Sequence, residues 1–524
     1  MMHAAMTSTT AQSPTVVAVR DMGASAIRLV VAEVGPKRKK RVLEELSRGV
    51  SLGRDTFSGG AIRSNTIEAA AASLDGFRRV MDSYGVHQVR AVATSAVREA
   101  RNGDMFLDRI RGRTGIAFEI INEAEESRLV YLAVREEFGK ADFFRSASPL
   151  LIEVGGGSTS LTQLRRGHPN RSGVYALGAV RMRQQLNLRA HSHEIQVSLL
   201  KRYIANVVAE IRVEIPLRQI SHVVAIGGDI RFAAGELLEP GHPGPRELAR
   251  DAFVAFCDEI ERMTPERLVE RFGLATSDAD SVLPGLLVYK SLLLESQAER
   301  LFVSDASLRA GVLLDLAEPG GRLGMEEFQQ VVLASAEALG QRYEFDRAHG
   351  RHVATLASQL FDALTEEHGL SSRDRLLLQV AGLLHDIGVF VSLRGHHKHA
   401  QYLLSSSQIF GLTDEENLMV SNIARYHRGA FPQQSHLPYI ALDKQDRLIV
   451  NKLAALLRVA NALDAEHLQK VERVQVARQR NVWVLQLDGK GDLTMEQMAA
   501  SSRADLFADV FGHQLVIRRA GVVQ

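Results

Sequence analysis

The chain has 524 residues, of which 45% are hydrophobic and 24% are charged. This length exceeds what one hydrophobic core supports, so it predicts roughly three or four ordinary globular domains. The formal net charge is +1, which gives no indication of a nucleic-acid partner and means that any basic surface is local. The single cysteine, Cys257, excludes an internal disulfide and fits a reducing cytoplasm.

Neither terminus nor any apolar segment predicts membrane insertion. Residues 1–14 lack a basic segment followed by an apolar one, so we expect a flexible tail and not a signal peptide. The most apolar later stretch, residues 282–294, contains a proline and a lysine and is too short to span a bilayer. We therefore predict a cytoplasmic protein without a membrane span.

The first predicted strand leads into a glycine turn and a second strand. In VVAVRDMGASAIRLVVAEV the apolar run meets an acid, Asp21, and the turn follows with Gly23, Ala24 and Ser25. Such a turn exposes backbone N–H groups with no large side chain in the way, which suits a phosphate. A third strand is predicted at residues 41–46, after PKRKKR. The five consecutive cations of this segment either contact a polyanion or form a solvated hairpin tip.

A helix and a buried strand are predicted next. Asn65 and Glu68 predict a capping box, and apolar residues follow at helical spacing. The strand of residues 89–93 ends where open α/β sheets bind their ligands. It delivers three polar residues there, namely Thr94, Ser95 and Arg98. Arg98 either donates two N–H groups to phosphate oxygens or forms a surface ion pair with Glu99 or Glu125.

Acidic residues precede the helix that follows. After a predicted strand at residues 116–121, NEAEESRLVYLAV places Glu125 and Glu126 at a helix N-terminus. There, either acid stabilises the helix by a few tenths to about 1 kcal/mol. Alternatively, one of them faces a cleft as a general base, and the sequence leaves both interpretations open.

A second copy of the strand and turn occurs at residues 151–161, LIEVGGGSTSL. Placing Asp21 on Glu153 puts Gly23 on Gly155. The second turn consists of Gly155, Gly156, Gly157 and Ser158. It predicts a second phosphate site, beside which Glu153 can hold a divalent cation such as Mg²⁺. A repeat at this scale implies two similar halves that bind a ligand between them.

Three further segments complete the second half. A third strand is predicted at residues 173–177, as in the first copy. VVAIGGD, residues 223–229, is a third possible ligand turn, and the proline and glycine content of residues 236–250 is typical of a surface loop.

From residue 325 to about residue 468 the pattern changes to amphipathic helices. An apolar helix at residues 376–384 runs into a histidine and an aspartate, and this pair belongs to a wider set. The set comprises His349, His385, Asp386, His399, His427 and Asp464. It predicts a metal site on a helical bundle. The remaining residues, with Trp483 and a late strand at residues 514–517, predict a small cap that contains β-structure.

Together the motifs resemble those of one family. DMGASAIRL, ATSAVREARN, EESRL, EVGGGSTSL, the GG of VVAIGGD, VSDASLRAGVL and LLHDIG occur in this order. They are similar to motifs of the exopolyphosphatase and guanosine pentaphosphate phosphohydrolase family. The resemblance implies an α/β fold of the actin and sugar-kinase superfamily, with duplicated ribonuclease-H-like halves around a cleft. Long members carry a further helical domain and form homodimers.

The resemblance also implies a domain order along the chain. The tail of residues 1–14 precedes a first half at residues 15–128 and a second half at residues 129–318. An all-helical HD-like domain at residues 325–470 and a small α+β cap at residues 471–524 follow.

The implied activity is Mg²⁺-dependent hydrolysis of a terminal phosphoanhydride. Glu126 falls on the family's catalytic glutamate and Arg98 on a phosphate-binding arginine. Glu153 falls on the metal-holding acid, and we expect Asp21 to approach the same cation. Gly156, Gly157 and Ser158 fall on the phosphate loop.

The phosphate loop departs from the family pattern at two positions. The family's DIGGGSTE is EVGGGSTS in this chain, so Glu153 replaces an aspartate and Ser160 replaces a glutamate. The longer acid moves its oxygens outward by one C–C bond, whereas Mg²⁺ demands near-ideal octahedral geometry. These changes alter the activity or shift the metal preference toward Mn²⁺.

The helical domain resembles the HD phosphohydrolase fold, with His349, His385 and Asp386 in the first metal positions. Where those enzymes have a final aspartate, this chain has Asn461, and an amide oxygen is a poorer ligand than a carboxylate. The possible second metal site is therefore weak. The alternative is a helical platform that binds the product chain or the partner subunit.

The sequence favours an exopolyphosphatase in which Glu126 deprotonates the water that attacks the terminal phosphorus of inorganic polyphosphate. Basic clusters at residues 37–41 and at Arg165 with Arg166 are expected near the cleft, where they would contact a long chain. Hydrolysis of guanosine pentaphosphate to tetraphosphate is the alternative in the same site. A sensor that binds an alarmone or polyphosphate without catalysis is the alternative from another class.

Overall fold

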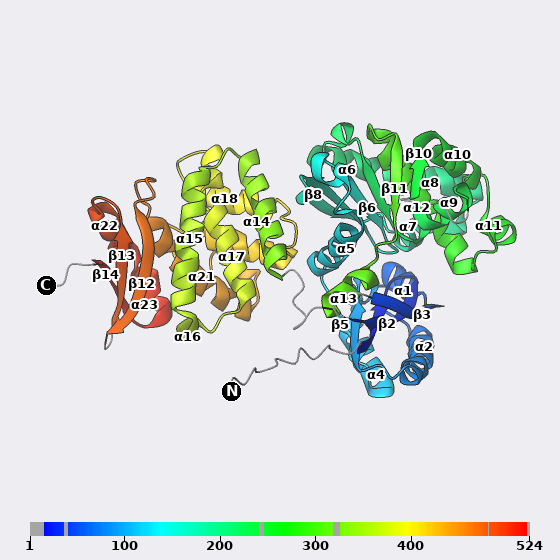
Figure 1. The fold of residues 1–524 in the computed structure, drawn as a ribbon, viewed down its shortest axis with the longest axis horizontal. Coiled ribbons are helices and arrows are strands. Elements are labelled where there is room, and N and C mark those ends of the chain that lie inside the picture. Colours follow the sequence, from blue (N-terminus) through cyan, green and yellow to red (C-terminus); the bar gives the residue numbers. More distant parts are fainter. Residues whose placement is uncertain (1–14, 36–39, 240–245, 318–324, 480–481, 521–524) are drawn as a thin grey trace, which may run out of the picture. The chain divides into compact units, whose positions relative to one another are not determined.

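The computed structural model describes residues 15–35, 40–239, 246–317, 325–479 and 482–520. The chain forms two compact units (Figure 1). One comprises the residues up to 325 except 169–171, and the other comprises residues 326–524 together with 169–171. The predicted tail of residues 1–14 lies outside the described residues.

A five-stranded sheet forms the centre of the first half, with the strand order β3-β2-β1-β4-β5. Strands β1, β2 and β3 are antiparallel neighbours, whereas β4 and β5 run parallel to β1. This is the topology of a ribonuclease-H-like half. The strands are β1 (Thr15–Met22), β2 (Ala26–Val34), β3 (Lys40–Gly49), β4 (Gln88–Ala93) and β5 (Glu119–Ile120).

Helix α2 buries the apolar face that its sequence predicts, including Ile67, Leu74 and Phe77, and it contacts β2 and α4 (Figure 1). The predicted capping box is wrong. The helix begins at Ser64, two residues earlier than that box requires, so Asn65 lies inside the first turn and its Oδ1 accepts from the N–H of Thr66. The helices of this half are α1 (Leu52–Gly59), α2 (Ser64–Ser83), α3 (Ser95–Arg98) and α4 (Gly103–Thr114).

The second half repeats this topology in a six-stranded sheet, β10-β11-β9-β6-β7-β8. Read from the other edge, the order is β8-β7-β6-β9-β11, which corresponds strand by strand to β3-β2-β1-β4-β5 of the first half. Strand β10 is an addition, antiparallel to β11 at the edge. The duplicated halves are therefore confirmed. The strands are β6 (Leu150–Val154), β7 (Thr159–Arg165), β8 (His168–Tyr175), β9 (Val223–Ile226), β10 (Arg246–Ala249) and β11 (Arg300–Ser304).

Two sequence predictions in this half need correction. The third strand begins at His168 and ends at Tyr175, so the prediction for residues 173–177 placed it too late. The predicted loop of residues 236–250 ends in strand β10, which pairs with β11. Residues 240–245 of that loop lie outside the described residues.

Helices surround the second sheet, and the last of them returns to the first half. Helix α13 contacts both α5 and β1 (Figure 1). A Cβ at Gly311 would clash with the Leu129 carbonyl, so only glycine allows α13 to approach α5 this closely. The helices are α5 (Glu123–Phe138), α6 (Asp142–Ser146), α7 (Ala179–Gln185), α8 (His193–Glu214), α9 (Gly228–Leu237), α10 (Arg250–Ile260), α11 (Pro265–Phe272), α12 (Thr276–Glu295) and α13 (Leu308–Leu316), with short 3-10 turns η2 (Leu188–Ala190) and η3 (Leu217–Gln219).

The C-terminal unit begins as a helical bundle, as predicted. Capping boxes begin α17, through Ser371 and Asp374, and α19, through Thr413 and Glu416. Its helices are α14 (Met325–Arg342), α15 (Arg347–Ala363), α16 (Thr365–His368), α17 (Ser372–Leu384), η4 (Ile387–Phe390), α18 (His396–Ser405), α19 (Asp414–Arg425), α20 (Leu437–Ile440) and α21 (Lys444–Ala462).

A three-stranded sheet and two helices complete this unit. Strands β12 and β13 are antiparallel, and β14 runs parallel to β13. The elements are β12 (Val471–Gln479), β13 (Val482–Gly489), α22 (Thr494–Arg503), α23 (Asp505–Phe511) and β14 (Gln514–Arg519). In the part of the chain that the structure describes, no helix is both long and apolar enough to cross a membrane.

Candidate active site

A cavity of about 410 Å³ lies where the carboxyl ends of β1, β4, β6 and β9 meet. The repeated topology explains this position, because it brings the corresponding strand ends of both halves together. The lining includes Asp21, Gly23, Ala24, Ser25, Thr94, Ser95, Glu126, Glu153, Gly155, Gly156, Gly157 and Ser158. These are the site residues predicted for this unit, with the exception of Arg98.

The glycine loop between β6 and β7 presents three N–H groups in one direction. The carbonyls of Gly155 and Gly156 accept from the backbone at the start of α7, and that of Gly157 accepts from Arg181 Nε. In a planar trans peptide the next residue's N–H points opposite to the carbonyl. The N–H groups of Gly156, Gly157 and Ser158 therefore all point away from α7, and together they form an anion-binding nest.

The turn between β1 and β2 faces this loop. The carbonyl of Ala24 accepts from the Gly53 N–H at 2.8 Å, which directs the N–H of Ser25 the opposite way. A Cβ at Gly156 would lie 3.0 Å from the Ala24 Cβ and 3.7 Å from the Ser25 nitrogen. The two predicted phosphate turns are therefore in contact, one from each half.

The structure distinguishes the two acids at the start of α5. Glu126 lines the cavity, where burial raises its pKa to about 7. Glu125 instead binds Arg128 at 2.7 and 2.8 Å and Arg90 at 3.1 Å. Burial alone would raise the pKa of Glu125, but both arginines outweigh it and lower that pKa. Glu126 is thus the candidate base, and Glu125 is structural.

Arg98 lies beside Glu126 but does not line the cavity described above. It donates to the Ile121 carbonyl at 2.7 Å and to Glu123 at 3.2 Å, and its NH1 lies 3.7 Å from a Glu126 oxygen. Neither predicted surface partner binds it, because Glu99 pairs with Arg181 and Glu125 pairs as described above. In this structure Arg98 therefore fixes the segment that carries Glu126.

Glu153 and Ser160 are directly opposite each other on β6 and β7. Cross-strand partners share one face of a sheet, so both departures from the family loop fall at one place. The pKa of Glu153 is raised to about 8, chiefly by burial and then by the charges of Glu126 and Asp21, against which Arg231 lowers it. A second cavity of about 20 Å³ is lined by Glu153, Ser160 and Thr162 among others. That is space for one water where the family pattern has a carboxylate.

Asp21 is the last residue but one of β1, and two arginines approach its carboxylate. Its Oδ2 accepts from Arg309 NH1 at 2.9 Å and lies 3.6 Å from Arg28 NH1. Its Oδ1 lies beside the glycine turn, 3.9 Å from the position of a Cβ on Gly23. One carboxylate oxygen of Asp21 is therefore engaged by arginine, and the other faces the turn.

Sequence reasoning missed six charged residues that line the cavity, namely Arg28, Glu123, Asp229, Arg231, Asp278 and Arg309. Asp229 ends the predicted third ligand turn, and burial raises its pKa to about 7. Its carboxylate packs on α12 where Gly285 has no side chain, since a Cβ there would clash with it. Two of these residues could have been found from the sequence. Asp229 belongs to the GGD turn that was predicted as a ligand turn, and Arg309 belongs to the family motif VSDASLRAGVL.

The described residues of the predicted basic clusters lie far from this cavity. In the β2–β3 hairpin, Val34 pairs with Lys40 at one end and Ala26 with Gly49 at the other. Lys40 and Arg41 thus lie at the end away from the phosphate turn, about 25–30 Å along the strand. Arg165 is likewise at the far end of β7 from the glycine loop. The expectation of a place near the cleft is therefore wrong for Lys40, Arg41 and Arg165, and residues 37–39 of the first cluster lie outside the described residues.

The cleft acids fit a hard divalent cation. Their donors are all oxygens, and burial, together with the neighbouring charges of Glu126 and Asp21, raises the pKa of Glu153 and so disfavours its charged form, which a bound cation would stabilise. Among the described residues, no three cleft acids bring donor atoms within 4.8 Å of one another. That spacing is typical of Mg²⁺ held by one or two carboxylates, with phosphate oxygens and water completing the shell.

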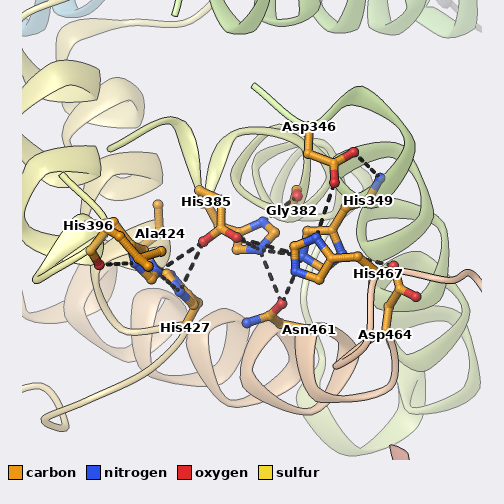
Figure 2. A network of polar contacts seen from close by, with 12 residues as sticks. Asp346, His349, Gly382, His385, His396, Ala424, His427, Asn461, Asp464 and His467 are labelled. Carbon is orange, nitrogen blue, oxygen red and sulfur yellow. Dashed lines mark hydrogen bonds and ion pairs between the residues drawn. The ribbon is translucent and has the colours of Figure 1, made fainter. Parts of the chain in front are cut away.

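The predicted second site lies in the C-terminal unit (Figure 2). His349, His385 and Asp386 come together there, whereas His399 belongs to neither group of possible metal ligands among the described residues. His396 approaches Asp386 instead, at 3.2 Å. The sequence HHKH, residues 396–399, indicated a histidine of the site in this segment. Only the position at which α18 begins shows that His396, and not His399, is buried there.

Two ribonuclease-H-like halves around a cleft of acids and anion-binding turns define the actin-like class of phosphate-binding proteins. The chain belongs to the Ppx/GppA phosphatase family, whose model matches residues 30–319, more than half of its length. A second model, Ppx/GppA phosphatase, domain III, matches residues 331–501. The chain is therefore a phosphatase.

Similar proteins carry related descriptions. Exopolyphosphatase 1 of Mycobacterium leprae is 25% identical over 302 residues, which cover 56% of this chain and 88% of that protein. An exopolyphosphatase from Cytophaga hutchinsonii has a solved structure with a TM-score of 0.52 and 22% identity, covering 58% of this chain and 98% of that one. A solved exopolyphosphatase-like protein also gives a TM-score of 0.52, with 23% identity and the same coverage. The solved structures support the fold.

Proposed function

We propose that the protein is an exopolyphosphatase, which releases orthophosphate from the end of inorganic polyphosphate. The observation that carries the proposal is the nest of Gly156, Gly157 and Ser158, which lines the same cavity as Glu126. An anion-binding nest and a carboxylate of raised pKa are what a phosphoanhydride hydrolase needs. The names of the relatives point to the same substrate.

In the proposed mechanism, a water oxygen attacks the terminal phosphorus and the bridging P–O bond breaks. The remaining chain keeps the bridging oxygen, and Glu126 accepts the proton of the attacking water. The nest and the Ser25 N–H neutralise charge on the equatorial phosphate oxygens, which supplies most of the catalysis in phosphoryl transfer. Arg98 holds Glu126 in place through its contacts to the start of α5.

Glu153, with the Asp21 oxygen that faces the glycine turn, is the proposed holder of Mg²⁺ or Mn²⁺. The bound cation would neutralise charge on the phosphate oxygens. Glu153 is protonated at neutral pH when its pKa is about 8, so cation binding would displace that proton.

The test compares orthophosphate release from long polyphosphate, a short oligophosphate and guanosine pentaphosphate, each with Mg²⁺ and with Mn²⁺. We expect polyphosphate to have the highest kcat/KM. A higher kcat/KM for guanosine pentaphosphate than for polyphosphate would show that the protein is an alarmone hydrolase. Binding of either compound without phosphate release would favour the sensor.

A matched pair of variants tests where the substrate lies. Arg28 lines the cavity, whereas Arg41 pairs with Glu33 near the far end of the same hairpin. We expect Arg28→Gln to raise the KM for polyphosphate and to weaken the salt dependence of that KM. Arg41→Gln should leave both quantities unchanged. An equal effect of both variants would contradict this placement of the chain.

The homodimer and the cytoplasmic location are part of the proposal. The homodimer rests on the family resemblance, and the cytoplasmic location rests on the single cysteine. Sedimentation of the full chain at several concentrations tests the first, and a monomer throughout would contradict it.

A further inference from the structure

We propose that Arg181 is a positioning residue, which keeps the anion-binding nest of the glycine loop in its phosphate-binding conformation only while the two ribonuclease-H-like halves are closed on each other. Arg181 lies in the first turn of α7 and does not line the cavity. It acts on the reaction through the loop and not through the substrate. The inference rests on the phosphate-binding role of the nest that is proposed above.

Two carbonyls of the glycine loop are held by the backbone, and a third is held by a side chain. The carbonyls of Gly155 and Gly156 accept from backbone N–H groups at the start of α7. In the described part of the chain the carbonyl of Gly157 accepts from no backbone N–H, and its donor is Arg181 Nε at 2.5 Å. The orientation of the peptide between Gly157 and Ser158 therefore depends on one arginine.

This peptide could turn if that contact were lost. Glycine adopts positive and negative φ about equally readily, so residue 157 offers little resistance to a rotation that reverses its carbonyl. The same rotation would turn the N–H of Ser158 away from the cavity, because the N–H and the carbonyl are opposed across the peptide plane. The nest would then lose one of its donors.

The guanidinium of Arg181 is itself held by the other half. Its NH2 lies 2.6 Å from the carboxylate of Glu99, which follows α3, and its Cζ lies 4.2 Å from the centroid of the Phe57 ring in α1. The negative potential of the ring face attracts the cation, and the ion pair fixes its direction. Helices α1 and α7 are in contact (Figure 1). The first half therefore places the group that orients a loop of the second half.

The loop is also packed tightly between the halves. A Cβ at Gly157 would lie 3.0 Å from the Phe57 ring and would clash with Ser95 Oγ in α3. A Cβ at Gly178 would clash with the carbonyl of Gly157 from the α7 side. The loop and Arg181 thus reach this arrangement only when α1, α3 and α7 come together.

Separation of the halves would release Arg181. Its side chain is 13% exposed here, and without Glu99 and Phe57 the guanidinium would enter water, where hydration competes with the Gly157 carbonyl. The open state therefore has an incomplete nest. A phosphate that binds the closed state more tightly than the open state shifts the population toward closure. Arg181 thereby couples phosphate binding to the closure of the cleft.

The test measures orthophosphate binding by calorimetry, and kcat and KM for polyphosphate, on the full chain. We expect Arg181→Gln to weaken orthophosphate binding about tenfold, the effect of one lost hydrogen bond to a charged group. Its kcat should fall about a hundredfold, as for the loss of one preorganised oxyanion donor. KM for long polyphosphate should stay within a few-fold, because most of its phosphates lie outside the nest.

Arg181→Lys separates charge from geometry. The ammonium keeps the charge that pairs with Glu99, but it has no planar group to stack on Phe57 while it donates to the Gly157 carbonyl. We therefore expect Arg181→Lys to lose as much orthophosphate affinity as Arg181→Gln. Full affinity in Arg181→Lys would show that charge alone is needed, which would overturn the proposal.

Glu99→Gln tests the coupling to the first half. It removes the ion pair and leaves Arg181 and the loop in place, so it should weaken orthophosphate binding by less than Arg181→Gln. Added to Arg181→Gln it should have no further effect, because both substitutions act through one contact. The control is Arg183→Gln on the same helix. Arg183 pairs with Asp280 at 2.5 Å and does not line the cavity, so neither affinity nor kcat should change.

Hydrogen exchange provides an independent measurement. Amides of residues 155–158 should exchange faster in Arg181→Gln, while those of β9 should keep their rate. Unchanged orthophosphate affinity in Arg181→Gln would overturn the proposal, as would additive effects of Arg181→Gln and Glu99→Gln. Should Arg181→Gln not fold, Glu99→Gln decides, because its side chain is 38% exposed, and unchanged affinity in that variant would overturn the coupling.

The orthophosphate measurements do not depend on the identity of the substrate. If the unaltered chain released no phosphate from polyphosphate but the variants changed orthophosphate affinity as expected, the proposed function would fail and the role of Arg181 would stand.

Discussion

Glu126 and Glu125 are neighbours in the first turn of α5, yet they have different surroundings. Successive helical residues are about 100° apart, so one side chain reaches the cleft and the other reaches the ion network of Arg90 and Arg128. We predict that Glu126→Gln abolishes turnover while polyphosphate still binds, because the amide cannot accept the proton of water. Binding and phosphate release are measured on one sample.

The control for this variant is Glu136→Gln, an exposed acid farther along α5, which should keep full activity. More than about a tenth of the original rate in Glu126→Gln, equivalent to about 1.4 kcal/mol of barrier, would show that Glu126 is not the base.

The pH dependence of catalysis also reports on Glu126. Its pKa is raised to about 7, because burial, with smaller contributions from Asp21 and Glu123, outweighs the lowering by Arg98. A base must be deprotonated, so kcat/KM should fall as the pH falls through about 7. Arg98→Gln removes the positive charge that lowers this pKa, so the acidic limb should move to higher pH. An acidic limb that stays at the same pH or moves to lower pH in this variant would show that a group other than Glu126 titrates there.

The acid at position 153 should set the metal preference. Glu153→Asp shortens the side chain to the family's length, and we expect the ratio of Mg²⁺ to Mn²⁺ activity to rise. Because Ser160 is the cross-strand partner, adding Ser160→Glu should raise the ratio further. Assays of both variants with each metal check this, and an unchanged ratio and rate would show that residue 153 does not approach the metal.

At the scale of elements, α5 is held against α13 by a buried ion network. Asp315 on α13 accepts from Arg90 at 2.7 Å and from Arg128 at 3.1 Å, and Glu125 binds the same two arginines. This network fixes the helix that carries Glu126 to the helix that carries Arg309.

We predict that Asp315→Asn destabilises this contact by about 3 kcal/mol, the lower end of the range for a buried pair that loses one partner. Hydrogen exchange in α5 and α13 should become about a hundredfold faster, and kcat should fall with it. Glu68→Gln, which breaks an exposed pair with Arg109, is the control and should change exchange little. Unchanged exchange in Asp315→Asn would show that packing alone holds α13.

At the scale of the whole molecule, the two polar clusters belong to different units. Glu126 and the glycine loop lie in the first, and the histidine cluster lies in the second. We therefore predict that His385→Ala and Asp386→Ala leave phosphate release from polyphosphate within a few-fold of the original rate. The assay is run on variants whose folding is verified by circular dichroism. Complete loss of activity in a folded variant would show that the cluster takes part in the cleft reaction.

The sequence by itself determined the features that depend on neighbours along the chain. Asp21 with Gly23 and Glu153 with Gly155 repeat one strand and turn, and this local pattern predicted two halves with a site at their strand ends. The apolar spacing of α2 and the helical character of residues 325–468 followed from the same kind of periodicity. The domain boundaries stay predictions, and the one placed after residue 128 falls within α5.

Only the tertiary structure decided features that depend on direction. The choice between Glu125 and Glu126 required the rotation of α5, and the choice of His396 over His399 required the position of α18. The basic hairpin was misplaced because a strand carries its two turns to opposite ends of the sheet, which composition does not record. Asp229, Arg231 and Arg309 reach the cleft from separate segments, and their convergence depends on the packing of the two halves.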